Sequence, residues 1–181
     1  MKTIPNYLTL LRIFLIPVMM AAFYVESSLG SWIAALSFVA ACVTDYLDGL
    51  VARLLSQTSK LGQFLDPTAD KLLVASTILL LAGFDKLSRP SLIPAVIILC
   101  REILVSGLRE TLLELQVPMP VTRLAKWKTA IQMAALSGLM VDDAIKFGGT
   151  VHFMGEGLLW LAAFLTLLTG YSYIRAGLKH F

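Results

Sequence analysis

The sequence predicts an all-α integral membrane protein with six transmembrane helices and a short N-terminal juxtamembrane segment. Two observations lead to this fold class. Of the 181 residues, 57% are hydrophobic and only 15% are charged, and the mean hydropathy is +0.79, whereas a typical soluble domain is about half apolar and about a quarter charged. A span takes about 20 residues, so six spans leave only short connectors. We therefore expect residues 1–181 to form a single membrane domain.

Six apolar runs follow a polar lead-in, which covers residues 1–6. They predict helices over residues 7–25, 31–53, 67–84, 91–113, 121–141 and 150–174. The connectors between them, 26–30, 54–66, 85–90, 114–120 and 142–149, carry polar, Gly, Pro and Ser residues that are typical of loops. The first run resembles a signal peptide, but Pro5, Asn6 and Arg12 interrupt it and no small-residue cleavage site follows. We therefore interpret it as an uncleaved span.

Basic residues near the helix ends predict the orientation in the membrane. An even number of spans places both termini on one side, and most flanking basic residues share that side: Lys2, Arg53, Lys60, Lys71, Arg109, Arg123, Lys126, Lys128, Arg175 and Lys179. The other side has Lys86, Arg89 and Lys146. By the positive-inside rule, we expect both termini and the connectors 54–66 and 114–120 to be cytoplasmic. The lack of a transit-type leader favours a multi-pass protein of a bacterial inner membrane.

Some partners are disfavoured by composition. The net charge is +3, but no Lys/Arg run is interleaved with aromatic residues, so we expect no nucleic-acid partner. Cys42 and Cys100 both lie in apolar runs and predict no disulfide framework.

We expect His152 to lie on the far side of the membrane, without partner carboxylates nearby.

Four aspartates form the candidate metal centre. Asp45 and Asp48 are three residues apart, and Asp66 and Asp70 are four apart, so each pair shares a helix face. A short hairpin brings the two faces together, and such carboxylates repel one another unless cations intervene. Hard oxygen donors select Mg²⁺, Mn²⁺ or Ca²⁺. Four carboxylates can hold two ions about 3.5–4 Å apart, the arrangement used in phosphoryl transfer.

Other interpretations of this region stay open at this point. The carboxylates could be solvated at the interface or paired with nearby basic residues, which are Arg53, Lys60 and Lys71. A glycine at position 49 destabilises the predicted helix. Its presence is explained either by the close approach of a nucleotide to the backbone or by tight packing against another helix. Arg53 suits a diphosphate because of its forked guanidinium, or it extends to the interface.

The segment Asp45-Tyr-Leu-Asp48-Gly49-Leu-Val-Ala52-Arg53, followed at fixed spacing by Gly62, Asp66 and Asp70, resembles the complete signature of the CDP-alcohol phosphotransferases. The expected six spans also fit that family. The resemblance implies that Asp45, Asp48, Asp66 and Asp70 hold two divalent cations, Mg²⁺ or Mn²⁺. It also implies that Asp70 is the catalytic base and that the chain forms a homodimer. The positive-inside rule places this active site at the cytoplasmic side.

The same resemblance implies a site for the donor, CDP-diacylglycerol, among surrounding membrane lipids. Its residues are Gly49, Arg53, Ser59 and Gly62. In the first run, Asn6, Thr9 and Arg12 keep one helix face polar, which resembles the donor-binding segment of the family and adds Asn6 and Thr9 to the site. The alternative is that Asn6 is an N-cap.

The acceptor is predicted from basic residues of the fourth and fifth runs: Arg101, Arg109, Lys126 and Lys128. Such a cluster suits a phosphate-bearing acceptor, although Glu102 could instead form a structural pair with an arginine. The strings Arg101-Glu102-x₆-Arg109 and Lys126-Trp127-Lys128-Thr129 resemble the branch of the family that makes phosphatidylglycerol phosphate, which implies glycerol 3-phosphate as acceptor. Alternatives are another acceptor (phosphatidylglycerol, serine or an inositol phosphate) or a small divalent-cation transporter.

Overall fold

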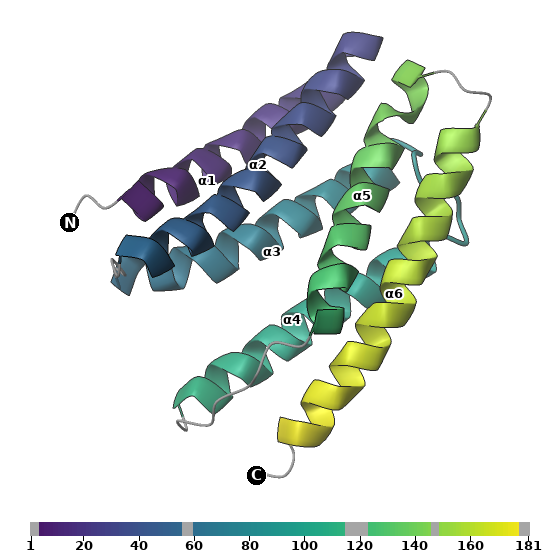
Figure 1. The fold of residues 1–181 in the computed structure, drawn as a ribbon. Coiled ribbons are helices and arrows are strands. Elements are labelled where there is room, and N and C mark those ends of the chain that lie inside the picture. Colours follow the sequence, from purple (N-terminus) through teal and green to yellow (C-terminus); the bar gives the residue numbers. More distant parts are fainter. Residues whose placement is uncertain (1–3, 56–59, 115–122, 146–148, 178–181) are drawn as a thin grey trace.

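The computed structural model describes residues 4–55, 60–114, 123–145 and 149–177, and these residues form six helices and no strand (Figure 1). The helices are α1 (Ile4–Phe23), α2 (Ser28–Leu55), α3 (Lys60–Gly83), α4 (Leu92–Glu114), α5 (Arg123–Ile145) and α6 (Thr150–Gly177). The all-α prediction is confirmed.

Two helix boundaries differ from the predicted ones in ways that affect the site. α3 begins at Lys60 instead of residue 67, so Asp66 lies inside a helix and Pro67 follows it there. The predicted helix began at this proline, whose missing N–H donor suits a first helical turn, but membrane helices also tolerate proline further inside. α1 begins at Ile4, so the alternative that Asn6 is an N-cap is wrong.

The helix ends alternate between the two ends of the bundle. The starts of α1, α3 and α5 lie at the same end as the last turns of α2, α4 and α6 (Figure 1). We call this the aspartate end, because Asp45, Asp66 and Asp70 lie in the halves of α2 and α3 nearest to it. The opposite end carries the α1–α2 and α3–α4 connections.

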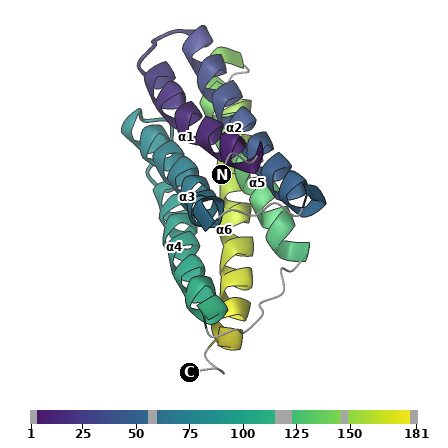
Figure 2. The same cartoon turned by 90° about the vertical axis from the view of Figure 1, so that its left-hand side faces the viewer.

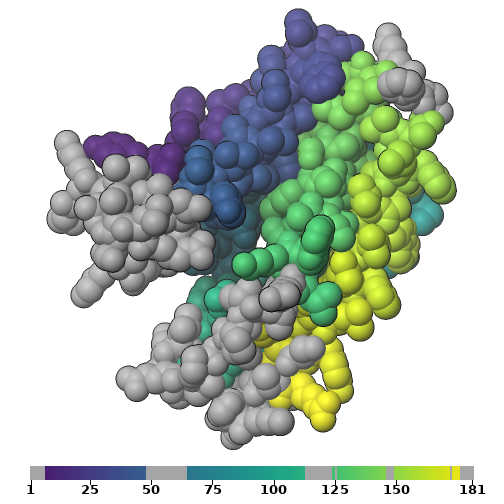
Figure 3. Space-filling model, viewed as in Figure 1, coloured from purple at the N-terminus to yellow at the C-terminus, as the bar shows by residue number. Residues whose placement is uncertain are grey.

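The helices pack mainly as two antiparallel pairs, α1 with α2 and α5 with α6, and α2 joins the pairs by contacting α5. α2, α5 and α6 lie side by side on one face (Figure 3). α1 also packs against α3 (Figure 2), and α4 packs against α6. Gly155 lets α6 approach α5 closely, since a Cβ there would lie 2.9 Å from Cγ of Leu139. Small residues at helix contacts are typical of membrane proteins.

The exterior of the bundle is apolar on every helix. At least one large apolar side chain of each helix is 60% exposed or more: Phe14, Leu36, Leu79, Ile103, Trp127 and Phe153. Soluble monomers rarely expose so much apolar surface. The segments Ser28–Leu47 and Thr150–Arg175 are long and apolar enough to cross a membrane, and Tyr7–Phe23 is a shorter apolar helix. These features are those of a membrane protein.

Candidate functional site

Two buried polar side chains of α1 contact the aspartate-bearing helices. Thr9 and Arg12 are three residues apart on one helix face, and neither has exposed surface. Oγ1 of Thr9 donates a hydrogen bond of 2.5 Å to Oδ1 of Asp66 on α3. Nη1 of Arg12 lies 2.9 Å from Oδ1 of Asp45 on α2. α1 therefore connects the carboxylates of two different helices.

Asp70 lies one turn after Asp66 on α3 and is half-buried. It is within electrostatic range of Asp45 and Arg12, and also of Glu102 on α4 and Lys128 on α5. Charged side chains from four other helices thus act on one carboxylate of α3. The negative charges of Asp45 and Glu102 repel that of Asp70, and the positive charges of Arg12 and Lys128 offset this repulsion.

The carboxylates fit a divalent cation in their chemistry, because Mg²⁺ and Mn²⁺ prefer hard oxygen donors. Within the described ranges, however, no three His, Cys, Asp or Glu side chains lie close enough together to hold a metal ion. The side chain of Asp48 is not among those that the structure describes. Oxygens of Asp45 and Asp66 face Arg12 and Thr9 instead. A cation bound by these carboxylates would therefore lie beside the contacts that α1 makes with them.

A second cluster joins α4, α5 and α6. Glu102 accepts a hydrogen bond from the buried Nζ of Lys128, and its Oε1 also lies 3.7 Å from Nη1 of Arg101. Nη2 of Arg101 donates to Oγ1 of Thr169 at 2.9 Å, and the guanidinium lies over the ring of Tyr173. Two of the predicted phosphate ligands are thus held in place by partners from the protein. The predicted structural pairing of Glu102 with an arginine is also present.

The predicted acceptor residues differ in burial. Arg109 and Lys126 are exposed, whereas Lys128 is buried. Ser59 lies outside the described residues, and the structure describes only the backbone of five further predicted residues: Asn6, Asp48, Gly49, Arg53 and Gly62.

Arg12 and Thr169 were not predicted as site residues. Arg12 had a visible signal, because it is a charged residue inside an apolar run and one turn from Thr9. Thr169 had none, since a threonine in an apolar helix is common and its partner Arg101 is 68 positions away.

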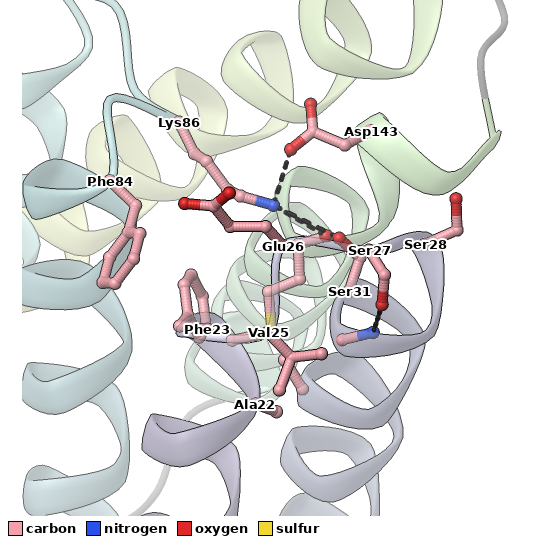
Figure 4. A pocket seen from close by; sticks show the side chains of 13 residues that line it. Ala22, Phe23, Val25, Glu26, Ser27, Ser28, Ser31, Phe84, Lys86 and Asp143 are labelled. Carbon is pink, nitrogen blue, oxygen red and sulfur yellow. Dashed lines mark hydrogen bonds and ion pairs between the residues drawn. The ribbon is translucent and has the colours of Figure 1, made fainter.

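A separate polar pocket of about 360 Å³ lies at the opposite end of the bundle (Figure 4). Lys86 reaches into it from the α3–α4 connection, with Nζ 2.9 Å from Oδ2 of Asp143 and 3.4 Å from Oγ of Ser31. The ammonium also lies 5.6 Å from the ring centroid of Phe23. These contacts tie the connection to α1, α2 and α5, so Lys86 has a structural role.

His152 has the partner carboxylates that the sequence did not predict. Its ring nitrogens lie 3.5 Å from Oδ2 of Asp142 and 3.4 Å from Oε1 of Glu156. The prediction was wrong because α5 continues to Ile145, so Asp142 is helical and reaches the start of α6. Glu156 also accepts a hydrogen bond of 2.8 Å from the backbone N–H of Ser88.

Comparison with known proteins gives consistent matches over the whole chain. A family model described as CDP-alcohol phosphatidyltransferase matches residues 2–168. A protein of Rickettsia felis named CDP-diacylglycerol–glycerol-3-phosphate 3-phosphatidyltransferase is 47% identical, over 99% of this chain and 98% of its own length. Proteins with the same name from Haemophilus influenzae and Cereibacter sphaeroides are 38% and 34% identical, covering 95% and 98% of this chain and 91% and 96% of their own lengths.

Proposed function

The chain belongs to the CDP-alcohol phosphatidyltransferase family, and from this we propose that it transfers the phosphatidyl group of CDP-diacylglycerol to glycerol 3-phosphate. The products are phosphatidylglycerol phosphate and CMP. The choice of acceptor rests on one observation. Lys128 and Glu102 form an ion pair that acts electrostatically on Asp70, and Arg101 lies beside this pair. A basic cluster suited to a phosphate-bearing alcohol therefore adjoins the proposed base. The names of the full-length relatives support the same reaction.

Asp45, Asp48, Asp66 and Asp70 would hold two divalent cations, Mg²⁺ or Mn²⁺. When bound, the cations supply positive charge that offsets both the carboxylates and the diphosphate of the donor. Thr9 supports this assignment, because its hydroxyl orients Asp66 from a third helix.

Asp70 is the proposed catalytic base. Its carboxylate accepts the proton of a glycerol hydroxyl while that oxygen forms a bond to the phosphorus that carries diacylglycerol. The bond between this phosphorus and the CMP oxygen breaks, and CMP leaves with the electron pair. The position of Asp70 between the α2 aspartate and the Glu102–Lys128 pair supports this role, since the acceptor and the donor have to meet there.

The donor subsite comprises Asn6, Thr9, Gly49, Arg53, Ser59 and Gly62. Thr9 supports this placement, because its hydroxyl lies beside Asp66, where the diphosphate would bind.

The acceptor subsite comprises Arg101, Arg109, Lys126 and Lys128. Lys128 supports this placement because its charge acts on Asp70, whereas the exposed Arg109 and Lys126 suit the entry of the acceptor from water.

The proposed placement in the membrane has six spans, with both termini and the aspartate end in the cytoplasm. Helices of 20 to 28 residues are long enough, since about 20 residues cross the hydrocarbon core. The apolar exterior of each helix supports crossing by all six. We propose a single domain over residues 1–181 in a bacterial inner membrane, and a homodimer from the family resemblance.

The test is CMP release from CDP-diacylglycerol by protein purified in detergent, with Mg²⁺ or Mn²⁺ present. Glycerol 3-phosphate is compared with serine, an inositol phosphate and phosphatidylglycerol. We expect release with glycerol 3-phosphate, and its loss in Asp70→Asn. The matched control is Asp85→Asn, which makes the same change at an exposed turn with φ of 53°, a conformation that Asn tolerates. Release with another acceptor would overturn the acceptor assignment, and cation flux into vesicles without CMP release would indicate a transporter.

A further inference from the structure

Arg12 has an unusual position for a charged side chain. It has no exposed surface, and it is the charged residue of a helix whose other residues are mostly apolar. Its Nη1 lies 2.9 Å from Oδ1 of Asp45, and the guanidinium is also within electrostatic range of Asp70. One cation from α1 thus faces carboxylates of both α2 and α3.

The charge balance of the site explains why a buried cation is present. Asp45 is within electrostatic range of Asp66 and of Asp70, so the carboxylates repel one another. A buried charge is strongly unfavourable unless it is paired. Arg12 and the aspartates satisfy this condition for each other in the arrangement that the structure shows. Lys128 contributes positive charge from the α5 side.

We propose that Arg12 is a built-in counter-ion that competes with a divalent cation for Asp45. The inference rests on the cation site of the proposed function. Without bound cations, Arg12 neutralises Asp45 and holds α2 against α1. When a cation binds Asp45, the guanidinium and the cation repel each other, so Arg12 has to leave Oδ1. Arg12 therefore lowers the cation affinity of the free protein and stabilises its cation-free form.

The experiment measures Mn²⁺ binding directly, from the electron paramagnetic resonance signal of free Mn²⁺, with detergent-purified protein and no substrate. We expect Arg12→Gln to bind Mn²⁺ roughly tenfold more tightly than the wild type, within the typical range for coupled binding. Arg12→Lys keeps the charge and should stay close to the wild type. Without Mn²⁺, Arg12→Gln should melt at a lower temperature than the wild type, and saturating Mn²⁺ should narrow the difference.

The matched control is Lys86→Gln at the opposite end. It breaks an ion pair of the same length, 2.9 Å to Asp143, and should lower the melting temperature without changing Mn²⁺ affinity. Equal or weaker Mn²⁺ binding by Arg12→Gln would overturn the inference, as would the absence of Mn²⁺ binding in every variant. If Arg12→Gln folds only when Mn²⁺ is present, that supports the inference; failure to fold in either condition contradicts it.

The Mn²⁺-binding assay contains no CDP-diacylglycerol, so it tests the role of Arg12 independently of the proposed phosphatidyl transfer. Protein that binds Mn²⁺ with the expected differences but releases no CMP would refute the proposed reaction and leave the role of Arg12 intact. Protein that releases CMP while Arg12→Gln binds Mn²⁺ no more tightly would refute the role of Arg12 alone.

Discussion

Oγ1 of Thr9 donates a hydrogen bond to Oδ1 of Asp66, across 57 positions of sequence. One turn further along α1, Arg12 pairs with Asp45. The first helix therefore fixes the carboxylates of the second and third helices relative to each other. Its short polar face is the part of α1 that matters for the chemistry proposed above.

We predict that Thr9→Val weakens both folding and activity. Valine has a similar shape but no hydroxyl, so Asp66 loses a hydrogen-bond donor at a buried position. The free energy of unfolding, measured by SDS titration in mixed micelles, should fall by about 1.5 kcal/mol. Thr9→Ser keeps the donor and should retain most of the stability and CMP release. If Thr9→Val released CMP as fast as the wild type, α1 would have no role in positioning Asp66.

We predict that Glu102→Gln disturbs the acceptor side of the site. The change leaves the buried ammonium of Lys128 without its carboxylate, and breaking a buried pair costs about 3 kcal/mol of stability. The KM for glycerol 3-phosphate should change more than the KM for CDP-diacylglycerol.

The control for Glu102→Gln is Glu110→Gln on the same helix. Glu110 pairs with Lys71 at 3.2 Å, but its side chain is exposed, and such pairs contribute about 0.2–1 kcal/mol. Glu110→Gln should therefore lower the free energy of unfolding only slightly. Equal effects of the two substitutions would show that the buried pair has no special role.

We predict that Gly170→Ala on α6 displaces Arg101. A Cβ at this position would lie 3.1 Å from Cγ and 3.2 Å from Nε of Arg101, so the arginine side chain has to move by a few tenths of an ångström, which strains its hydrogen bond to Thr169. The expected result is a higher KM for glycerol 3-phosphate, measured by CMP release. Gly157→Ala on the same helix meets nothing within 4 Å and should gain up to about 1 kcal/mol of helix stability. If Gly170→Ala left the KM for glycerol 3-phosphate unchanged, Arg101 would have no role in acceptor binding.

The sequence was sufficient to predict the helical class and the helices themselves, because each helix is a long apolar run between polar residues. The start of α3 was not predictable in the same way. The residues before Pro67 were predicted to form a connector, yet the helix begins at Lys60 and continues through them. Tertiary contacts decide such cases, and here Asp66 is held from outside by Thr9.

The candidate site was predictable where chemistry is carried by charged residues at helical spacing, as for Asp45, Asp66 and Asp70. Its supporting contacts were not, because they depend on which helices pack together. The hydrogen bond between Arg101 and Thr169 follows from the packing of α4 on α6. The burial of Lys128 beside Glu102 likewise depends on how α4 and α5 meet, whereas Lys126, two residues away, is exposed.

The most direct test of the proposed reaction is to supply glycerol 3-phosphate labelled in its carbons, with CDP-diacylglycerol and Mg²⁺, and to analyse the lipid extract by mass spectrometry. The account predicts labelled phosphatidylglycerol phosphate in amounts equal to the CMP released, with both lost in Asp70→Asn. CMP release without label in the lipid would contradict the account, because the phosphatidyl group would then have gone to water or to another alcohol.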